Sequence, residues 1–152
     1  MSLQIGEKAP LFSAKNQDGK VVSLTDFGGQ KLVLYFYPKD DTPGCTAQAC
    51  SLRDNYTALL AQGYVVLGVS TDDEKKHQKF IKKYDLPFSL LADTDQKIVN
   101  DYGVWVEKSM YGRIYMGTAR TTFIIDEQGI ISEIISKIDT KNHAEQVLGS
   151  AS

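Results

Sequence analysis

The most constraining feature of the sequence is the passage from an apolar run, residues 31–37 (Lys-Leu-Val-Leu-Tyr-Phe-Tyr), into residues 38–50, which hold both cysteines of the 152-residue chain. The run is rich in β-branched and aromatic residues, as expected of a strand buried on both faces in the middle of a sheet. A helix then begins, because Asp41 or Thr42 can cap it and a proline follows at the first helical position. We expect this helix to span residues 43 to about 61.

Cys45 falls in the first turn of that helix. Unpaired N–H groups and the positive end of the helix dipole favour an anion there, so Cys45 is predicted to be the reactive thiolate. Cys50 lies five residues further on, and ideal helix geometry puts the two Cα atoms roughly 8.7 Å apart. A disulfide needs less than about 7 Å. The pair is therefore either never joined or joined only in a catalytic cycle that unwinds the first turns.

The rest of the pattern indicates an α/β fold. Residues 11–24 are predicted to form a β-hairpin around Asp18-Gly19. Strands are expected at 64–70, 88–92, 121–126 and 130–136. Helices are expected at 72–84, capped by Thr71 or Asp72, and at 96–102 and 142–148. Residues 104–118 are expected to be less regular, with turns at Gly112 and Gly117. This order implies one domain, residues 1–152, with a mixed central sheet covered by helices on both faces, for which the thioredoxin-like fold fits best.

Composition and charge exclude several classes of function. The formal net charge of -2 gives no broad attraction to nucleic acid. No apolar run approaches the length of a membrane span, and the N-terminus lacks the apolar core of a signal peptide, so a cytoplasmic location is expected. No glycine-rich phosphate loop appears, and two cysteines five apart fit no usual zinc site, so no cofactor or metal is expected. His77 and His143 are expected on the surface, and Asp40 and Asp41 are expected to face solvent, away from a thiolate.

Pro38-x-x-x-Thr42-x-x-Cys45 matches the active-site pattern of peroxiredoxins. The longer string Tyr-Phe-Tyr-Pro-Lys-x-x-Thr-Pro-Gly-Cys-Thr-x-Gln-Ala-Cys, residues 35–50, resembles the branch of that family called bacterioferritin comigratory protein or peroxiredoxin Q. Residues 103–109 and 120–126 are also similar to that branch, so the resemblance covers most of the chain.

The resemblance implies a thiol-dependent peroxidase. Cys45 would be the peroxidatic cysteine, Thr42 would hydrogen-bond the thiolate and the peroxide, Pro38 would shield the pocket, and Cys50 would resolve the sulfenic acid. Arg120 stands at the start of a predicted neighbouring strand, from which a guanidinium can reach the loop, and the resemblance favours this role. The implied partners are hydrogen peroxide or a small organic hydroperoxide and thioredoxin or a similar dithiol, and a monomer is expected.

Other interpretations of the same residues stay open. Cys50 could be an unreactive helix cysteine, Thr42 only a helix cap, Pro38 only a strand end, and Arg120 a solvated side chain. A thiol-disulfide oxidoreductase on the same fold usually shows Cys-x-x-Cys, which is absent. A non-catalytic redox sensor would be oxidised once without turnover, and an inert binding module would have an unreactive Cys45.

Overall fold

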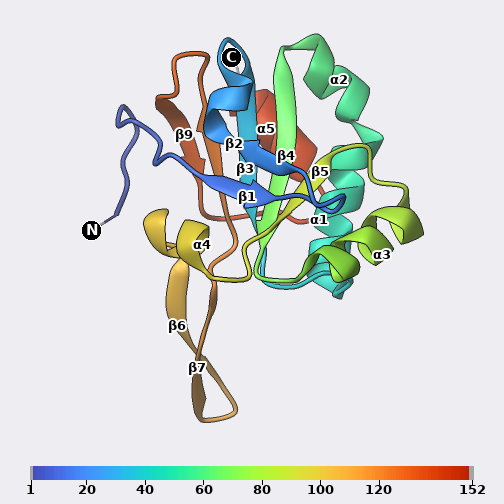
Figure 1. Ribbon diagram of the computed structural model, residues 1–152, viewed down its shortest axis with the longest axis vertical. Helices are drawn as coiled ribbons and strands as arrows, with labels where there is room; N and C mark the ends of the chain where they lie inside the picture. The colour runs from blue at the N-terminus through green and yellow to red at the C-terminus, as the bar shows by residue number, and fades with distance from the viewer. Residues whose placement is uncertain (1, 151–152) are drawn as a thin grey trace.

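The computed structural model describes residues 2–150. Its centre is a five-stranded sheet with the order β5-β4-β3-β8-β9 (Figure 1). The strands are β3 (Lys31–Phe36), β4 (Tyr64–Ser70), β5 (Ser89–Ala92), β8 (Thr121–Ile125) and β9 (Ile131–Ile135). β3, β4 and β5 run parallel, whereas β8 and β9 are antiparallel to their neighbours. The mixed sheet confirms the predicted fold class, and the apolar run at residues 31–37 supplies its central strand.

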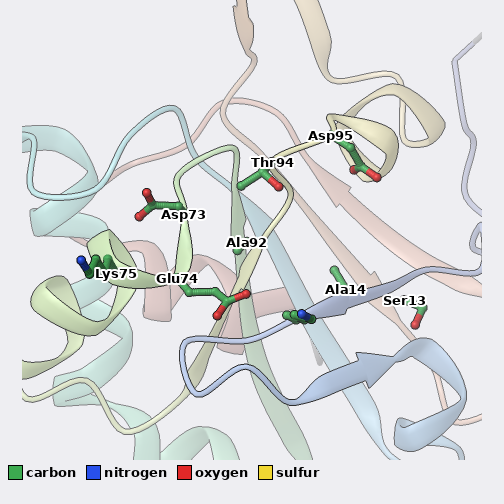
Figure 2. Close-up of a pocket in the computed structure, with 9 residues that line it drawn as sticks. Ser13, Ala14, Asp73, Glu74, Lys75, Ala92, Thr94 and Asp95 are labelled. Atoms are coloured by element: carbon green, nitrogen blue, oxygen red, sulfur yellow. The ribbon is translucent and has the colours of Figure 1, made fainter.

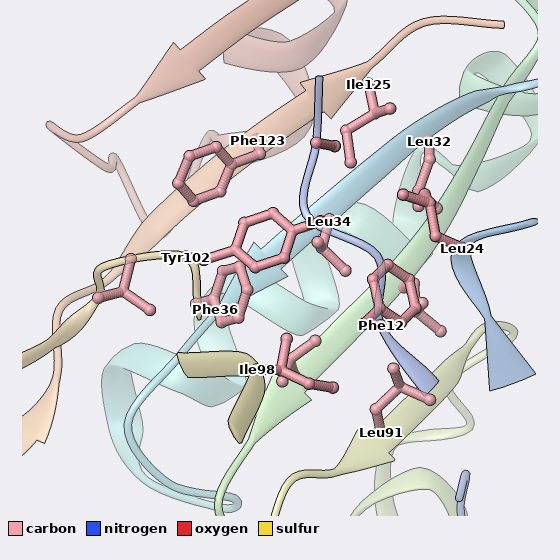
Figure 3. Close-up of a cluster of buried hydrophobic side chains, with 14 of the residues drawn as sticks. Phe12, Leu24, Leu32, Leu34, Phe36, Leu91, Ile98, Tyr102, Phe123 and Ile125 are labelled. Carbon is pink, nitrogen blue, oxygen red and sulfur yellow. The ribbon is translucent and has the colours of Figure 1, made fainter. Parts of the chain in front are cut away.

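Helices cover both faces of the sheet, as predicted. They are α1 (Pro43–Asp54), α2 (Tyr56–Ala61), α3 (Glu74–Tyr84), α4 (Lys97–Asp101) and α5 (His143–Ser150). α4 packs on the first face together with the predicted N-terminal hairpin, β1 (Ser13–Lys15) and β2 (Val21–Ser23), and the short 3₁₀ helix η1 (Leu24–Phe27). The core on this face centres on three aromatic rings, Phe36, Tyr102 and Phe123, whose centroids lie 5.2–5.8 Å apart (Figure 3).

The second face carries the cysteine helix. Val33, Tyr35 and Tyr37 point to this side of β3 and its extension, because side chains alternate along a strand. The helices that pack on them are α1, α2, α3 and α5, which contribute buried residues that include Cys45, Leu52, Leu59, Phe80 and Val147. Cys45 is thus part of a hydrophobic core as well as of a helix N-terminus.

The helix predicted over residues 43–61 is divided at Asn55, so its predicted length is wrong. The side-chain amide of Asn55 donates to the carbonyl of Ser51 at 2.8 Å. In a continuous helix that carbonyl would accept from the backbone N–H of Asn55, which here donates to Arg53 O instead. Asparagine competes for backbone groups in this way, and this explains the break without glycine or proline.

The start of α3 also differs from the prediction. Its N-cap is Asp73, whose carboxylate accepts from the Lys76 backbone N–H at 2.9 Å. Asp72 is not free to cap, because its carboxylate accepts from Ser70 Oγ and from the backbone N–H of Asp40, both at 2.8 Å.

Residues 104–118 form a regular hairpin, β6 (Trp105–Met110) and β7 (Arg113–Thr118), which projects from the body of the protein (Figure 1). The expectation of irregular structure, with a turn at Gly117, is therefore wrong. Tyr111 and Gly112 both have positive φ, 52° and 77°, as a tight two-residue hairpin turn requires.

No helix within residues 2–150 is long and apolar enough to cross a membrane.

Candidate active site

Cys45 lies where the sequence predicted, in the first turn of α1. The loop before it leaves the carboxyl end of β3, next to the carboxyl end of parallel β4, the edge of an α/β sheet where sites gather. The Cys45 side chain is 1% exposed, whereas Cys50 is half-buried, and both are free thiols. Both cysteines lie within one continuous helix, so a bridge between them requires α1 to open.

Arg120 reaches the same helix turn from another part of the chain. It directly precedes β8, whose first residue, Thr121, pairs with Phe36 at the end of β3. The Arg120 Nη1 donates to Gln48 Oε1 at 2.8 Å, and its Nη2 lies 3.1 Å from the position that a Cβ on Gly44 would occupy. The structure therefore brings a guanidinium against the turn that carries Cys45, and glycine leaves room for it.

Two further polar groups near this turn were not singled out from the sequence. Gln48 lies three residues after Cys45 and is fully buried. This spacing puts both side chains on one side of a helix, so it could have identified Gln48 as a candidate site residue. Within residues 2–150, Gln48 Nε2 and Tyr35 Oη have no hydrogen-bond partner. Burial raises the pKa of Tyr35 well above its ordinary value, with smaller contributions from Asp40 and Cys45, and Arg120 opposes the rise. Tyr35 therefore stays a neutral phenol within electrostatic range of Cys45.

Thr42 occupies the N-cap position of α1 in extended backbone, but its side chain makes no capping hydrogen bond. Its hydroxyl donates instead to the backbone oxygen of Lys39 at 2.9 Å. The single hydroxyl proton is thereby engaged, while the lone pairs of Oγ1 can still accept a hydrogen bond. Pro38 is half-buried at the start of the same loop.

Lys108 of β6 adds a second cation that the sequence did not indicate. Its side chain is half-buried, and its Cδ and Cε lie 3.2 and 3.4 Å from the position that a Cβ on Gly117 would take. Burial lowers the pKa of Lys108, Arg120 lowers it further, and Cys45 opposes the change. Lys108 thus contributes positive charge within range of both Arg120 and Cys45.

The expectation that His77 and Asp40 face solvent is wrong. His77 is fully buried and Asp40 is 8% exposed, and His77 Nδ1 lies 2.6 Å from Asp40 Oδ2. A buried polar pair is stable only when hydrogen-bonded, and each of these groups has its partners. Asp41, by contrast, is exposed as expected, and its carboxylate pairs with Lys83 Nζ at 2.9 Å.

His143 is also fully buried rather than on the surface. Its Nε2 lies 2.8 Å from Thr122 Oγ1 of β8, and its Nδ1 lies 2.8 Å from Gln146 Oε1. Burial lowers the pKa of His143 from its ordinary value, and the hydrogen bond to Gln146 partly opposes this. His143 joins α5 to the sheet.

A separate surface pocket lies at the N-terminal end of α3 (Figure 2). Ser13, Asp73, Glu74, Thr94 and Asp95 are among its lining residues, and no predicted site residue is. In the described part of the chain, no group of three or more His, Cys, Asp and Glu side chains is arranged to hold a metal.

A helix-borne, nearly buried cysteine beside a guanidinium, on a mixed sheet covered on both faces, defines a thiol enzyme of the thioredoxin fold. Comparisons with known proteins agree. Residues 5–134 match the AhpC/TSA family model. The chain is 49% identical over 149 residues to the putative peroxiredoxin bcp of Coxiella burnetii, covering 98% of this chain and 99% of that protein. It is 48% identical over 146 residues to peroxiredoxin Bcp of Escherichia coli, covering 96% and 94%.

Among solved structures, a cysteine-to-serine mutant of Xylella fastidiosa PrxQ superposes with a TM-score of 0.93 at 31% identity, covering 99% of this chain and 96% of that one. The chain belongs to the AhpC/TSA family, and within it to the peroxiredoxins of the bacterioferritin comigratory protein and peroxiredoxin Q branch. It is therefore a thiol peroxidase, an oxidoreductase that acts on peroxides with a thiol as reductant.

Proposed function

We propose that Cys45 reduces hydrogen peroxide or a small organic hydroperoxide, that Cys50 resolves the product, and that thioredoxin or a similar dithiol restores the enzyme. The single observation that carries the proposal is the Arg120 guanidinium, held by Gln48 against Gly44 in the helix turn that contains Cys45. The helix N-terminus and this cation both favour an anionic sulfur and an anionic transition state.

In the first step, the Cys45 sulfur attacks the nearer peroxide oxygen. An S–O bond forms as the O–O bond breaks, and the departing oxygen takes up a proton and leaves as water or an alcohol. Arg120 stabilises the charge that moves onto that oxygen. Thr42 Oγ1, whose own proton is engaged by Lys39, accepts the hydrogen bond of the hydroperoxide O–H. Pro38 shields one side of the pocket.

In the second step, the Cys50 thiol displaces water from the Cys45 sulfenic acid and forms a disulfide. The intact helix holds the two Cα atoms roughly 8.7 Å apart, so the first turns of α1 unwind before this step. An external dithiol then reduces the disulfide by exchange, and two thiols are regenerated while the dithiol is oxidised. We further propose that residues 1–152 act as a single domain and a monomer.

The test is the intact mass of the reduced protein seconds after one equivalent of hydrogen peroxide. We expect the loss of two hydrogens, which marks the disulfide, and no change in Cys45→Ser. Cys50→Ser should gain one oxygen and lose turnover with thioredoxin and its reductase. An unchanged mass over minutes would contradict peroxide reduction by Cys45, and thioredoxin-linked turnover in Cys50→Ser would remove Cys50 from the mechanism.

Turnover also separates this function from its rivals. A redox sensor would consume one equivalent of peroxide and stop, even when the dithiol reductant is in excess. A thiol-disulfide oxidoreductase would react faster with a protein disulfide than with hydrogen peroxide. We expect many equivalents of peroxide to be consumed per protein molecule.

A further inference from the structure

A chain of buried hydrogen bonds connects α3 to the loop that precedes Cys45. His77 of α3 presents Nδ1 to Asp40 Oδ2 at 2.6 Å and Nε2 to the backbone oxygen of Leu91 in β5 at 2.8 Å. The other carboxylate oxygen of Asp40 accepts from the Tyr37 hydroxyl. The backbone N–H of Asp40 donates to Asp72 Oδ2 at 2.8 Å. Asp40 is therefore held from three sides, and none of these contacts has a part in the mechanism proposed for Cys45.

The partners of the His77 ring decide where the protons lie. The Leu91 carbonyl can only accept, so Nε2 carries a hydrogen. Burial, with a further contribution from Asp40, raises the pKa of Tyr37 well above its ordinary value, so the phenol donates to Asp40. Between Nδ1 and Oδ2 a proton must also be present, because two facing lone pairs 2.6 Å apart would repel. A buried network satisfied in this way fixes one arrangement of its members.

The residue after Asp40 has an uncommon backbone conformation. Asp41 has φ 57°, in the left-handed region. Few residues other than glycine adopt this conformation, although aspartate does so more readily than most, and it persists where the surroundings enforce it. The carboxylate of Asp41 is also tied to α3, by Lys83 Nζ and by the Tyr84 hydroxyl, but these contacts are exposed and such pairs contribute little. The buried contact of Asp40 with His77 is the stronger restraint, and Thr42 follows directly.

We propose that His77 is a positioning residue for peroxide reduction: through Asp40 it fixes the loop that sets Thr42 beside the bound peroxide. The inference rests on the proposed function of Cys45. Alignment of the peroxide depends on this loop, and a misplacement of about 1 Å can slow a reaction roughly 10²-fold. A simple alkylating reagent needs no alignment by Thr42, so its reaction with Cys45 should be much less affected.

Two substitutions of His77 separate its two hydrogen bonds. In His77→Asn the side-chain amide can occupy the position of Nδ1 and still donate to Asp40, whereas in His77→Gln it reaches the position of Nε2 and serves Leu91. Both remove the imidazole ring. The measurement is made in the full chain with Cys50→Ser, so that Cys45 is the only thiol, and it compares the second-order rate constants for hydrogen peroxide and for iodoacetamide.

We expect His77→Gln to slow the reaction with hydrogen peroxide about tenfold or more, and His77→Asn to stay within about threefold of the unsubstituted rate. The reaction with iodoacetamide should stay within about threefold in both. Equal rates with peroxide in the two variants, or a parallel loss with iodoacetamide, would overturn the inference. Lys83→Met, which breaks the exposed pair with Asp41 and the contact of Lys83 Nζ with the Tyr84 ring, is the matched control and should leave both rates within about twofold.

Tyr37→Phe covers the case in which His77→Gln does not fold, as judged by circular dichroism. It removes one donor to Asp40 and keeps the ring in the core, so slower peroxide reduction with unchanged alkylation is expected, and unchanged peroxide reduction would overturn the inference. A protein with native His77 that does not react with peroxide at all would contradict the proposed function, and this inference with it. If the protein with native His77 reacts normally with peroxide and the substitutions have no effect, only this inference is contradicted and the proposed function stands.

Discussion

At the scale of single residues, the reactivity that we propose for Cys45 involves a cation from a distant part of the chain. Arg120 lies 75 positions after Cys45 in the sequence, yet it meets the same helix turn because β8 pairs antiparallel with β3. Gln48 orients the guanidinium by accepting from Nη1, and Gly44 leaves space for Nη2. The arrangement is local in space and long-range in sequence.

Arg120→Met should therefore slow the reaction of Cys45 with hydrogen peroxide by about 10²–10³-fold, the usual loss when one donor to a developing charge is removed. Arg120→Lys should recover only part of the rate, because an ammonium keeps the charge but lacks the planar fork that faces Gln48 and Gly44 together. Stopped-flow single turnovers would measure both variants. An Arg120→Met rate equal to that of the unsubstituted protein would exclude this electrostatic role.

For single residues, the sequence predicted position within a helix better than burial. The position of Cys45 in the first helix turn followed from proline and capping residues, and the structure places it there. The burial of His77 was missed because charged residues surround it in the sequence. The signal was present, however, since Phe80, Ile81 and Tyr84 follow His77 at helical spacings of three, four and seven, on one apolar face.

At the scale of elements, the proposed mechanism gives α1 two requirements that oppose each other. The helix is formed when Cys45 meets peroxide, and its first turns open when Cys50 reaches the sulfenic acid. The competing fate of a sulfenic acid that waits is oxidation to sulfinic acid by further peroxide. Under this proposal, the stability of α1 sets the balance between resolution and over-oxidation.

Ala47→Gly tests this balance. Glycine in a helix interior costs about 1 kcal/mol relative to alanine, which makes the unwound turn about fivefold more populated. We expect a correspondingly smaller fraction of sulfinic acid at a fixed excess of hydrogen peroxide, measured by intact mass. Ala58→Gly, the same change at an exposed position of α2, is the matched control and should leave that fraction unchanged. Equal over-oxidation in the two variants would show that unwinding of α1 is not limiting.

Element boundaries were predictable where a local signal dominates. β4 spans residues 64–70 as expected, because an uninterrupted apolar run has few alternatives. The hairpin of β6 and β7 was missed because its apolar side chains do not alternate with polar ones: Ile114, Tyr115 and Met116 are consecutive and all exposed. Its turn places the non-glycine residue Tyr111 at positive φ, which sequence signals disfavour.

At the scale of the whole molecule, a mixed sheet covered by helices on both faces was predictable because alternating strands and helices with right-handed crossovers permit few arrangements. The contacts that join α5 to the rest were not, since they depend on side chains far apart in sequence. His143 lies against Thr122 of β8 at 2.8 Å, and the backbone N–H of Ala144 donates to Ser51 Oγ of α1 at 3.1 Å. α5 thus closes over both the sheet and the cysteine helix.

The buried contact of His143 with Thr122 should make the free energy of unfolding depend on pH. Burial lowers the pKa of His143 in the folded protein, whereas the unfolded chain has the ordinary value of about 6.5. Below that value the unfolded state binds a proton that the folded state does not, so the free energy of unfolding falls as pH drops through 6.5, by at most about 1.4 kcal/mol per pH unit. The loss is complete once the folded His143 is protonated as well.

Urea unfolding between pH 7.5 and 5 would measure this slope in the unsubstituted protein and in His143→Gln, whose amide can still reach Thr122 Oγ1. We expect a shallower pH dependence in the variant, together with a small loss of stability at pH 7.5 from altered packing. Because His77 and all carboxylates remain in both proteins, the difference between the two slopes isolates His143. Identical slopes would mean that His143 takes up its proton at the same pH in the folded and unfolded chains, and that its burial beneath α5 does not control the acid sensitivity of the fold.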